Sequence, residues 1–450
     1  MKPVPPVSLW PDPEALGALT DLYQLTMMAG YAAAGSSDDR ATFEMFVRRL
    51  PKGRSYLVFA GLEQAVGDLL RLRFSGDQIE AIRALPPFEG IDPTFFDSLA
   101  AVRFLGDVWA VPEGTVVFAG EPLIRIEAAL SQAQWVETFL LTSIGYPTLV
   151  ASKAARVVQS ASGRRVDDFG LRRGHGGAAG MIAARAAYLA GCAGTSNVEA
   201  AIRLGIPASG TMAHSWVQSF ATEADAFAAY ARTFPSNATL LVDTYDTLEG
   251  VRRAAAVEPP IQAVRLDSGD LLELSIKARA ELDALGRANV KIIASGDLDE
   301  HEIDRLVAAG APIDAFGVGT ELITSRDAPA LSLVYKLVAL NGAGRIKLSS
   351  GKKTYPLGKQ VHRFRDGQGQ FLRDHVTQAD EPCDGEPLLI PIVRNGILAA
   401  PLPGLDEIRA RCRRQLGDLP DSLRSLDGAP SYPVTYSDLL EDEAHRLGVK

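Results

Sequence analysis

The stretch Val264-Arg-Leu-Asp-Ser-Gly-Asp270 combines ionisable side chains with the pattern of a strand that is about to end. Apolar residues alternate with Arg265 and Asp267, as expected near the end of a buried strand, and a helix-favouring run over 271–285 follows the turn. Charges at the carboxyl end of a strand are where α/β proteins place their chemistry. A single loop of this kind is more simply explained as a capped turn with a solvated ion pair.

Six further apolar segments between residues 166 and 321 end in polar turns of the same kind, at the pace of successive βα units. If these units close into a barrel, the carboxyl ends of the strands meet at one mouth. That mouth would combine cations, acids, hydroxyls and a histidine, which suits an anionic, hydroxyl-bearing substrate. Its members would be Asp168, Arg172, Arg173, Thr195, Ser196, Thr211, His214, Asp243, Arg265, Asp267, Asp270, Ser295, Asp297, Gly319 and Thr320.

Glycine-rich turns follow the last two strands, at Ser295-Gly296 and Gly317-Val-Gly-Thr320. Bare backbone N–H groups in such turns can approach phosphate oxygens, as in the usual phosphate site of a βα barrel. His214 lies just past a strand end, where a neutral imidazole could act as a base or as a nucleophile toward a phosphoryl group; a structural histidine is the simpler alternative. No spacing of His and Asp forms a tight metal cage, so Mg²⁺ held mainly by substrate phosphates and one or two Asp is favoured.

The net charge of −9 means that the overall electrostatics favour neither nucleic acid nor an anionic membrane as a partner. Within this acidic chain, residues 328–365 contain no Asp or Glu but several Lys and Arg, which indicates a site for a small polyanion. The three cysteines form neither a disulfide framework nor a zinc spacing, and they favour a reducing, cytoplasmic location. We find no signal peptide and no apolar run of about 18 residues, so no membrane span is expected.

A chain of 450 residues is expected to form two or three domains. Residues 1–131 indicate a mixed α/β domain, which begins with a helix over 15–34; by its spacing alone, Tyr23 would be a core aromatic of that helix. Alternating strands and helices predict a βα barrel over 132–329, with a doubly wound open sheet as the alternative. Short strands and charged helices predict a C-terminal segment over 330–450.

Seven segments together resemble nicotinate phosphoribosyltransferases, and the resemblance extends over nearly the whole chain. They are Thr20–Gln24, Phe43–Gly61, Asp168–Arg173, Gly210–Ser215, Asp243–Tyr245, Arg265–Asp270 and Gly317–Thr320. The resemblance implies a type II phosphoribosyltransferase fold: a mixed α/β domain, an incomplete βα barrel, and a C-terminal extension that partly completes the N-terminal domain. It also implies a homodimer whose active sites are shared between subunits.

The same resemblance implies that the nitrogen of nicotinate attacks C1 of 5-phosphoribosyl 1-diphosphate, with ATP as co-substrate and Mg²⁺ on the diphosphate. ATP hydrolysis would be coupled through a phosphorylated His214, and nicotinate mononucleotide would feed NAD biosynthesis. The implied catalytic residues are His214, Asp243, Arg265 and Asp267. The implied nicotinate-binding residues are Phe169, Arg172, Ser196, Thr211, Arg265 and the partner subunit's Tyr23, which with Phe169 would sandwich the pyridine ring. The implied phosphoribosyl and phosphate positions are Ser295, Gly296, Asp297, Gly317, Gly319 and Thr320.

Three alternatives stay open. Relatives that use nicotinamide carry an Asp at the position of Ser196; Ser196 can donate to a carboxylate that an Asp would repel, which favours nicotinate over nicotinamide. A quinolinate-using enzyme is a second alternative. A catalytically silent barrel that binds phosphorylated metabolites is the alternative outside enzymes.

One departure from the family, Pro356-Leu-Gly358, leaves open whether Lys352 and Lys359 contact phosphate. Two distant cysteines, Cys383 and Cys412, cannot build the zinc site of some relatives, so no zinc is expected.

Overall fold

The structure is a computed structural model that describes residues 12–348, 354–427 and 430–448. Its largest sheet is antiparallel and has the strand order β13-β12-β1-β5-β3-β17-β18. Strands from both ends of the chain build it, because β12 pairs with β1 and β17 pairs with β3. The strands are β1 Arg40–Val47, β3 Asp107–Ala110, β5 Pro122–Ala129, β12 Leu333–Leu340, β13 Ala343–Gly344, β17 Ile390–Arg394 and β18 Ile397–Leu398.

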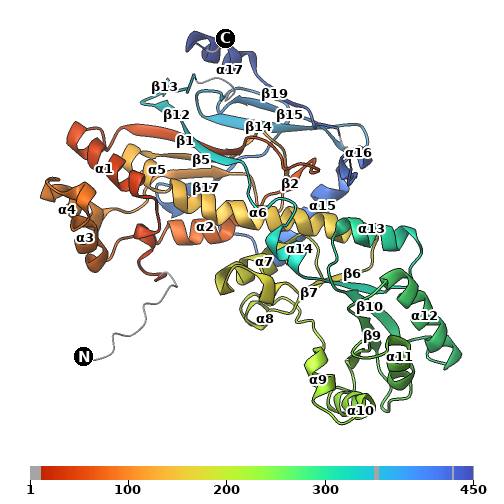
Figure 1. The fold of residues 1–450 in the computed structure, drawn as a ribbon. Coiled ribbons are helices and arrows are strands. Elements are labelled where there is room, and N and C mark those ends of the chain that lie inside the picture. Colours follow the sequence, from red (N-terminus) through yellow and green to blue (C-terminus); the bar gives the residue numbers. More distant parts are fainter. Residues whose placement is uncertain (1–11, 349–353, 428–429, 449–450) are drawn as a thin grey trace, which may run out of the picture.

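Helices of the N-terminal part pack around this sheet (Figure 1). They are α1 Leu22–Ala34, α2 Leu62–Leu69, α3 Gly76–Arg83, α4 Pro93–Ala101, α5 Leu130–Trp135 and α6 Glu137–Ser160, with the small strands β2 Leu57–Val58 and β4 Val116–Val117. The helix predicted to start at residue 15 starts instead at Leu22, because Leu16–Ala18 forms a separate 3-10 turn. That turn is fixed by the Trp135 indole N–H, which donates to the Gly17 carbonyl at 2.9 Å.

The second sheet is parallel and has the order β7-β6-β11-β10-β9-β8. Its strands are β6 Arg165–Asp168, β7 Gly194–Thr195, β8 Thr239–Leu241, β9 Ala263–Leu266, β10 Lys291–Ser295 and β11 Ala315–Val318. The intervening helices are α7 Gly177–Leu189, α8 Val198–Leu204, α9 His214–Gln218, α10 Glu223–Thr233, α11 Thr247–Ala255, α12 Leu271–Ala284, α13 Glu300–Ala308 and α14 Thr320–Thr324. The prediction of an incomplete βα barrel within a mixed α/β fold is confirmed.

The sequence predicts seven strands that end in polar turns in this region, but the parallel sheet of the described residues has six. The segment 208–214 contributes only an isolated bridge, in which Ala208 pairs with Thr195. Pro207 and Gly210 flank this position, and the segment lacks the continuous apolar run that a buried parallel strand needs. The long helix α6 continues through Pro147 without a break.

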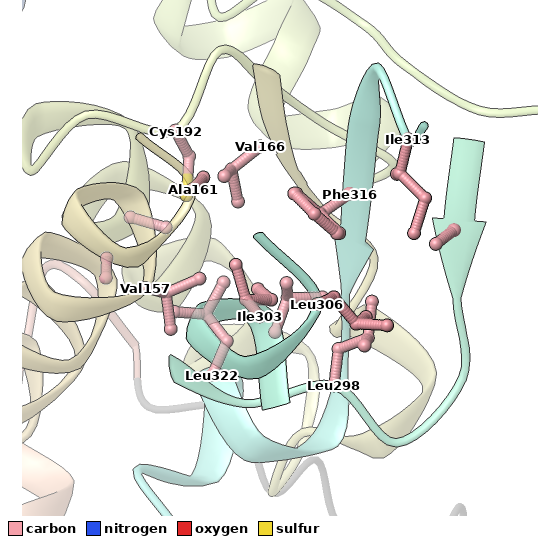
Figure 2. Close-up of a cluster of buried hydrophobic side chains, with 14 of the residues drawn as sticks. Val157, Ala161, Val166, Cys192, Leu298, Ile303, Leu306, Ile313, Phe316 and Leu322 are labelled. Carbon is pink, nitrogen blue, oxygen red and sulfur yellow. The ribbon is translucent and has the colours of Figure 1, made fainter. Parts of the chain in front are cut away.

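A smaller sheet, β16-β14-β15-β19, and three helices complete the C-terminal part. They comprise β14 Lys359–Arg365, β15 Phe371–Gln378, β16 Glu386–Pro387, β19 Val434–Tyr436, α15 Leu405–Gly417, α16 Asp421–Arg424 and α17 Asp438–Arg446. One apolar core fills the parallel half-barrel, and Figure 2 shows part of it, where Val157 of α6 lies near Phe316 of β11 and Leu322 of α14. Among the described residues, no helix is both long and apolar enough to cross a membrane.

Candidate functional site

A cavity of about 770 Å³ opens at the carboxyl ends of β6 and β7, beside the loop 208–213. It brings together five of the six residues to which the resemblance assigns the binding of nicotinate. These five lining residues are Phe169, Arg172, Ser196, Thr211 and Arg265. Side chains from four different βα units therefore meet at one rim.

Phe169 forms one wall of this cavity and is held from behind. Its backbone N–H donates to the Val318 carbonyl at 2.8 Å, and its ring packs directly on Gly317, where an added Cβ would lie 2.3 Å from the ring. A side chain at position 317 would push the ring out of place. The neighbouring Asp168 is buried and accepts hydrogen bonds from the Thr195 hydroxyl and the Gly170 N–H, both at 2.8 Å. Burial raises the pKa of Asp168, and these two hydrogen bonds partly oppose that rise.

Arg265, on β9, is another residue that lines this cavity. Its Nη1 donates to the Thr211 hydroxyl at 2.8 Å and to the Met212 carbonyl at 3.2 Å, while Nη2 lies 3.2 Å from Asp267 Oδ1. Its Nε is buried and has no hydrogen-bond partner among the described residues. This N–H of the guanidinium is therefore left without an acceptor by the described residues.

Two acids and a histidine lie next to Arg265. Asp243 Oδ2 accepts the Asp267 N–H at 2.9 Å and the Ser268 hydroxyl at 2.6 Å, whereas its buried Oδ1 has no hydrogen-bond partner in the part of the chain that the structure describes. His214 Nε2 lies 3.9 Å from Asp243 Oδ1 and 3.9 Å from Asp267 Oδ2. The His214 side chain is 39% exposed, so a soluble phosphoryl donor can reach the imidazole.

The partner of the other imidazole nitrogen is Thr244, whose Oγ1 lies 3.1 Å from His214 Nδ1. Sequence reasoning singled out the triplet Asp243-Thr-Tyr245 but gave Thr244 no role. The only available signal was its place beside Asp243, since the thirty residues between Thr244 and His214 hide the contact.

The two glycine-rich turns lie side by side at the same rim. Ser295 and Gly317 are register partners on β10 and β11, and the Ser295 hydroxyl donates to Asp267 Oδ1 at 2.5 Å. Gly296 has φ +93°, and an added Cβ there would lie 2.1 Å from the Asp267 carbonyl oxygen. Asp297 adopts φ +46°, a conformation that is rare for residues other than glycine and that clusters at functional sites. Gly319 and Thr320 lead from β11 into α14.

The basic residues noted in the sequence divide into two groups. A cavity of about 220 Å³ is lined by the cations Arg48, Lys336 and Lys347 and by Thr354. Within the described ranges, none of the three cations has an ion-pair partner. Lys359 is buried instead: its Nζ lies 2.7 Å from Glu44 Oε2, and burial lowers its pKa despite that partner. Lys359 is thus unavailable to a phosphate, and Lys352 lies outside the described residues.

Tyr23 does not join the cavity of its own chain. The expectation from spacing that it is a core aromatic is wrong, because the residue is 47% exposed at the start of α1. Figure 1 places α1 at the far end of the molecule from β9 and β10. Exposed apolar side chains accompany it on the same part of the surface, namely Leu19, Leu22 and Met27.

Models of known protein families match three successive parts of the chain. Residues 18–145 match the nicotinate phosphoribosyltransferase (NAPRTase) N-terminal domain, residues 164–380 match the NAPRTase family, and residues 381–443 match the NAPRTase C-terminal domain. The chain is 50% identical over 441 residues to nicotinate phosphoribosyltransferase pncB2 of Mycobacterium tuberculosis, which covers 96% of this chain and 94% of that protein. It is 38% identical to the nicotinate phosphoribosyltransferase of Bacillus subtilis, with 95% and 94% covered.

Solved structures give the same result. The crystal structure of human nicotinic acid phosphoribosyltransferase superposes with a TM-score of 0.83 at 31% identity, covering 95% of this chain and 99% of that chain. The nicotinate-nucleotide pyrophosphorylase of Pyrococcus furiosus superposes with a TM-score of 0.75 at 27% identity, with 93% and 99% covered. The chain therefore belongs to the nicotinate phosphoribosyltransferase family.

Proposed function

We propose that this protein is an ATP-coupled nicotinate phosphoribosyltransferase of NAD salvage. It would join nicotinate to the ribose of 5-phosphoribosyl 1-diphosphate and release diphosphate. The observation that carries the proposal is the convergence of Arg265, Asp243, Asp267 and His214 at one rim, with the two glycine-rich turns beside them. Such a set can bind a carboxylate, stabilise a cation and accept a phosphoryl group.

The cavity suits nicotinate because it offers an aromatic wall and hydrogen-bond donors together. The Phe169 ring can stack on a pyridine, and the Arg265 guanidinium, which lines the same cavity, can donate to its carboxylate. Arg172 lines the same cavity, and its guanidinium has no ion pair among the described residues. Ser196 adds a hydroxyl donor where an Asp would repel the carboxylate, which supports an acid rather than an amide as substrate.

Asp243 and Asp267 suit the transfer step, because positive charge develops at the ribose carbon as the diphosphate leaves. Their oxygens are also the hard ligands that Mg²⁺ prefers, and the unpartnered Asp243 Oδ1 leaves one such oxygen free. The remaining ligands of this Mg²⁺ would be the phosphates of the substrate, because Mg²⁺ is usually bound through one or two carboxylates together with substrate phosphates. The ion would neutralise charge on the departing diphosphate.

His214 is the proposed phosphoryl acceptor. Its imidazole is oriented on one side by Thr244 and faces Asp243 and Asp267 on the other. An accessible imidazole fixed in this way can attack the γ-phosphorus of ATP, which forms an N–P bond and releases ADP, and the phosphorylated form would add negative charge next to Arg265 and the two acids.

We further propose a homodimer in which the partner subunit's Tyr23 covers the pyridine ring. Within one chain, Tyr23 is exposed and remote from the cavity, while Phe169 offers a single aromatic wall. The apolar side chains beside Tyr23 form a surface that is suited to association. Arg48, Lys336 and Lys347, for which the described part of the chain offers no ion-pair partner, are candidates for phosphate contacts in the assembled enzyme.

The decisive experiment is product formation from nicotinate, nicotinamide and quinolinate, each with and without ATP. The proposal expects turnover of nicotinate that ATP stimulates, and weak turnover of the other two pyridines. Equal or faster turnover of nicotinamide or quinolinate would reassign the substrate. Absence of turnover with all three would favour a silent barrel that only binds phosphorylated metabolites.

A further inference from the structure

Five charged side chains form a buried ion cluster behind the glycine-rich turns. They are Arg54, Lys153, Arg156, Glu300 and Asp327, and we call this set the buried ion cluster. Four of the five side chains are at most 5% exposed, and Asp327 is 34% exposed. Buried ion pairs seldom add net stability, because desolvation offsets their attraction. Four buried charges joined to a partly exposed fifth therefore call for another explanation.

The contacts join four separate segments of the chain. Lys153 Nζ lies 2.5 Å from Glu300 and 2.9 Å from Asp327, and Arg156 Nε lies 3.0 Å from Glu300. Arg54 donates from Nη2 to both carboxylate oxygens of Asp327 at 3.0 Å. Lys153 and Arg156 lie on α6, whereas Arg54 comes from the loop that follows β1.

Additional hydrogen bonds extend these links to the backbone. Arg54 donates to the Ser325 hydroxyl at 2.6 Å and to the Leu149 carbonyl at 3.1 Å. Arg156 donates to the Gly53 carbonyl at 2.9 Å. The cluster thus ties the rigid helix α6 to the loop around Gly53 and to the segment that follows α14.

Both acids stay ionised. Burial alone would raise the pKa of Glu300, but Lys153 and Arg156 more than offset it, so that the pKa is lowered. Burial also acts to raise the pKa of Asp327, and Arg54 and Lys153 overcome it and lower the pKa to about 2. With three cations and two anions, every charge in the cluster has an opposite charge as its neighbour.

The two acids stand just beyond the turns that the proposed function assigns to phosphate. Glu300 opens α13 three residues after the strained Asp297, and Asp327 follows the short helix α14 that Thr320 begins. Between each acid and its turn lies a buried leucine, Leu298 or Leu322, and both belong to the core cluster of Figure 2. Each turn is therefore held on its far side by an ion pair to α6.

We propose that Glu300 and Asp327 are positioning residues, which hold the Ser295–Asp297 and Gly317–Thr320 turns in the shape that binds the phosphoribosyl group. This inference rests on the proposed function and deepens it. The turns offer backbone N–H groups, so their affinity for phosphate depends on backbone placement rather than on a side chain. Lys153 of α6 contacts both acids, so anchoring both turns through this one residue would keep them in register with each other.

The test uses the full-length variants Glu300→Gln and Asp327→Asn, which keep side-chain shape but remove charge. Each should raise the KM for 5-phosphoribosyl 1-diphosphate roughly tenfold, while the KM for nicotinate stays within about twofold. Lys153→Arg, which keeps the charge, should retain most of the affinity. The matched control is Glu223→Gln, because Glu223 is equally buried and pairs with Arg253 at 3.0 Å, but lies on α10. It should change neither KM.

Amide hydrogen exchange supplies a second measurement that does not depend on turnover. Exchange should speed up in peptides that cover 295–300 and 317–327 in Glu300→Gln and Asp327→Asn, and not in the control. If the wild-type protein lacks transferase activity, the proposed function fails, whereas the exchange result still decides whether the ion cluster holds the turns. The inference would be overturned if the KM values for 5-phosphoribosyl 1-diphosphate and for nicotinate rose equally, or if both stayed unchanged and only Tm fell. Unchanged amide exchange in the two turn segments would also overturn it. If Glu300→Gln fails to fold, Asp327→Asn, with its partly exposed side chain, still gives the answer.

Discussion

Replacement of Arg265 gives the sharpest test of the proposed pyridine site. In Arg265→Ala the nicotinate carboxylate loses its charged donor, and a hydrogen bond to a charged group is worth about 1.5–3 kcal/mol. At about 1.4 kcal/mol per factor of ten, this predicts that kcat/KM for nicotinate falls roughly 10- to 150-fold. The loss should appear mainly as a higher KM for nicotinate, because the carboxylate is bound equally in substrate and transition state.

The contacts of Arg265 within the protein predict two further effects. Arg265 donates to Thr211 and lies against Asp267, so the variant frees both groups and a moderate fall in kcat is expected. Any residual turnover of nicotinamide, which lacks a carboxylate, should fall much less than that of nicotinate. Arg265→Lys should behave like a partial loss, since a lysine cannot reproduce the guanidinium fork.

Steady-state kinetics with both pyridines, at saturating 5-phosphoribosyl 1-diphosphate and ATP, measure these quantities. Arg252→Ala is the matched control, because Arg252 is an exposed arginine of α11 that pairs with Glu281 on α12. The reasoning is refuted if Arg265→Ala leaves KM for nicotinate and kcat unchanged. It is also refuted if nicotinate and nicotinamide lose activity by the same factor.

Four further predictions follow from the site and its surroundings. His214→Ala should abolish ATP stimulation but keep slow ATP-independent transfer, and label from γ-labelled ATP should disappear from the protein; retained label would exclude His214 as the acceptor. Thr244→Val removes one neutral hydrogen bond to the imidazole, worth about 0.5–1.5 kcal/mol, and should lower only the ATP-stimulated rate, by roughly 2- to 10-fold, with Thr244→Ser close to wild type. The variants Tyr23→Ala and Asp267→Asn should each have low transferase activity as homodimers. After subunit exchange, a dimer of one subunit of each variant should recover activity, because one shared site then contains both native residues; no recovery would argue against a shared site. The lowered pKa of Asp327, about 2 against an ordinary 3.8, means that its ionised form stabilises the fold above pH 3.8 and that this contribution fades as pH falls toward 2. The difference in urea-induced unfolding between wild type and Asp327→Asn should therefore shrink as pH falls from 6 to about 3, and a constant difference would contradict that assignment.

Strand ends were the part of the site that the sequence could reveal. Alternating apolar residues followed by Arg265 and Asp267, or by Ser295 and Gly296, are local patterns, and parallel strands bring such ends to one edge wherever the sheet forms. The loop 208–214 was misjudged as a strand end for the same reason, since its polar residues resemble the other turns although its backbone joins the sheet only at Ala208.

Long-range contacts could not be read in this way. The sequence does not reveal the ion pairs of Lys153 and Arg156, because the acidic partners Glu300 and Asp327 lie far away along the chain. The sequence left open whether Lys359 contacts phosphate, and the structure places this residue against Glu44. Only the fold decides whether a charge is solvated, paired or free for a ligand.

The mixed origin of the seven-stranded sheet has a consequence for synthesis of the chain on the ribosome. β1 pairs with β12 in a register that joins Ala41 to Leu340, so the N-terminal strands must wait for a partner made about three hundred residues later. Pairings of such high sequence separation form slowly, whereas the half-barrel between residues 165 and 318 is built from nearby βα units and can fold first. A chain that stops at residue 329 would expose the open edge of β1, and we expect it to aggregate rather than to yield a smaller working enzyme.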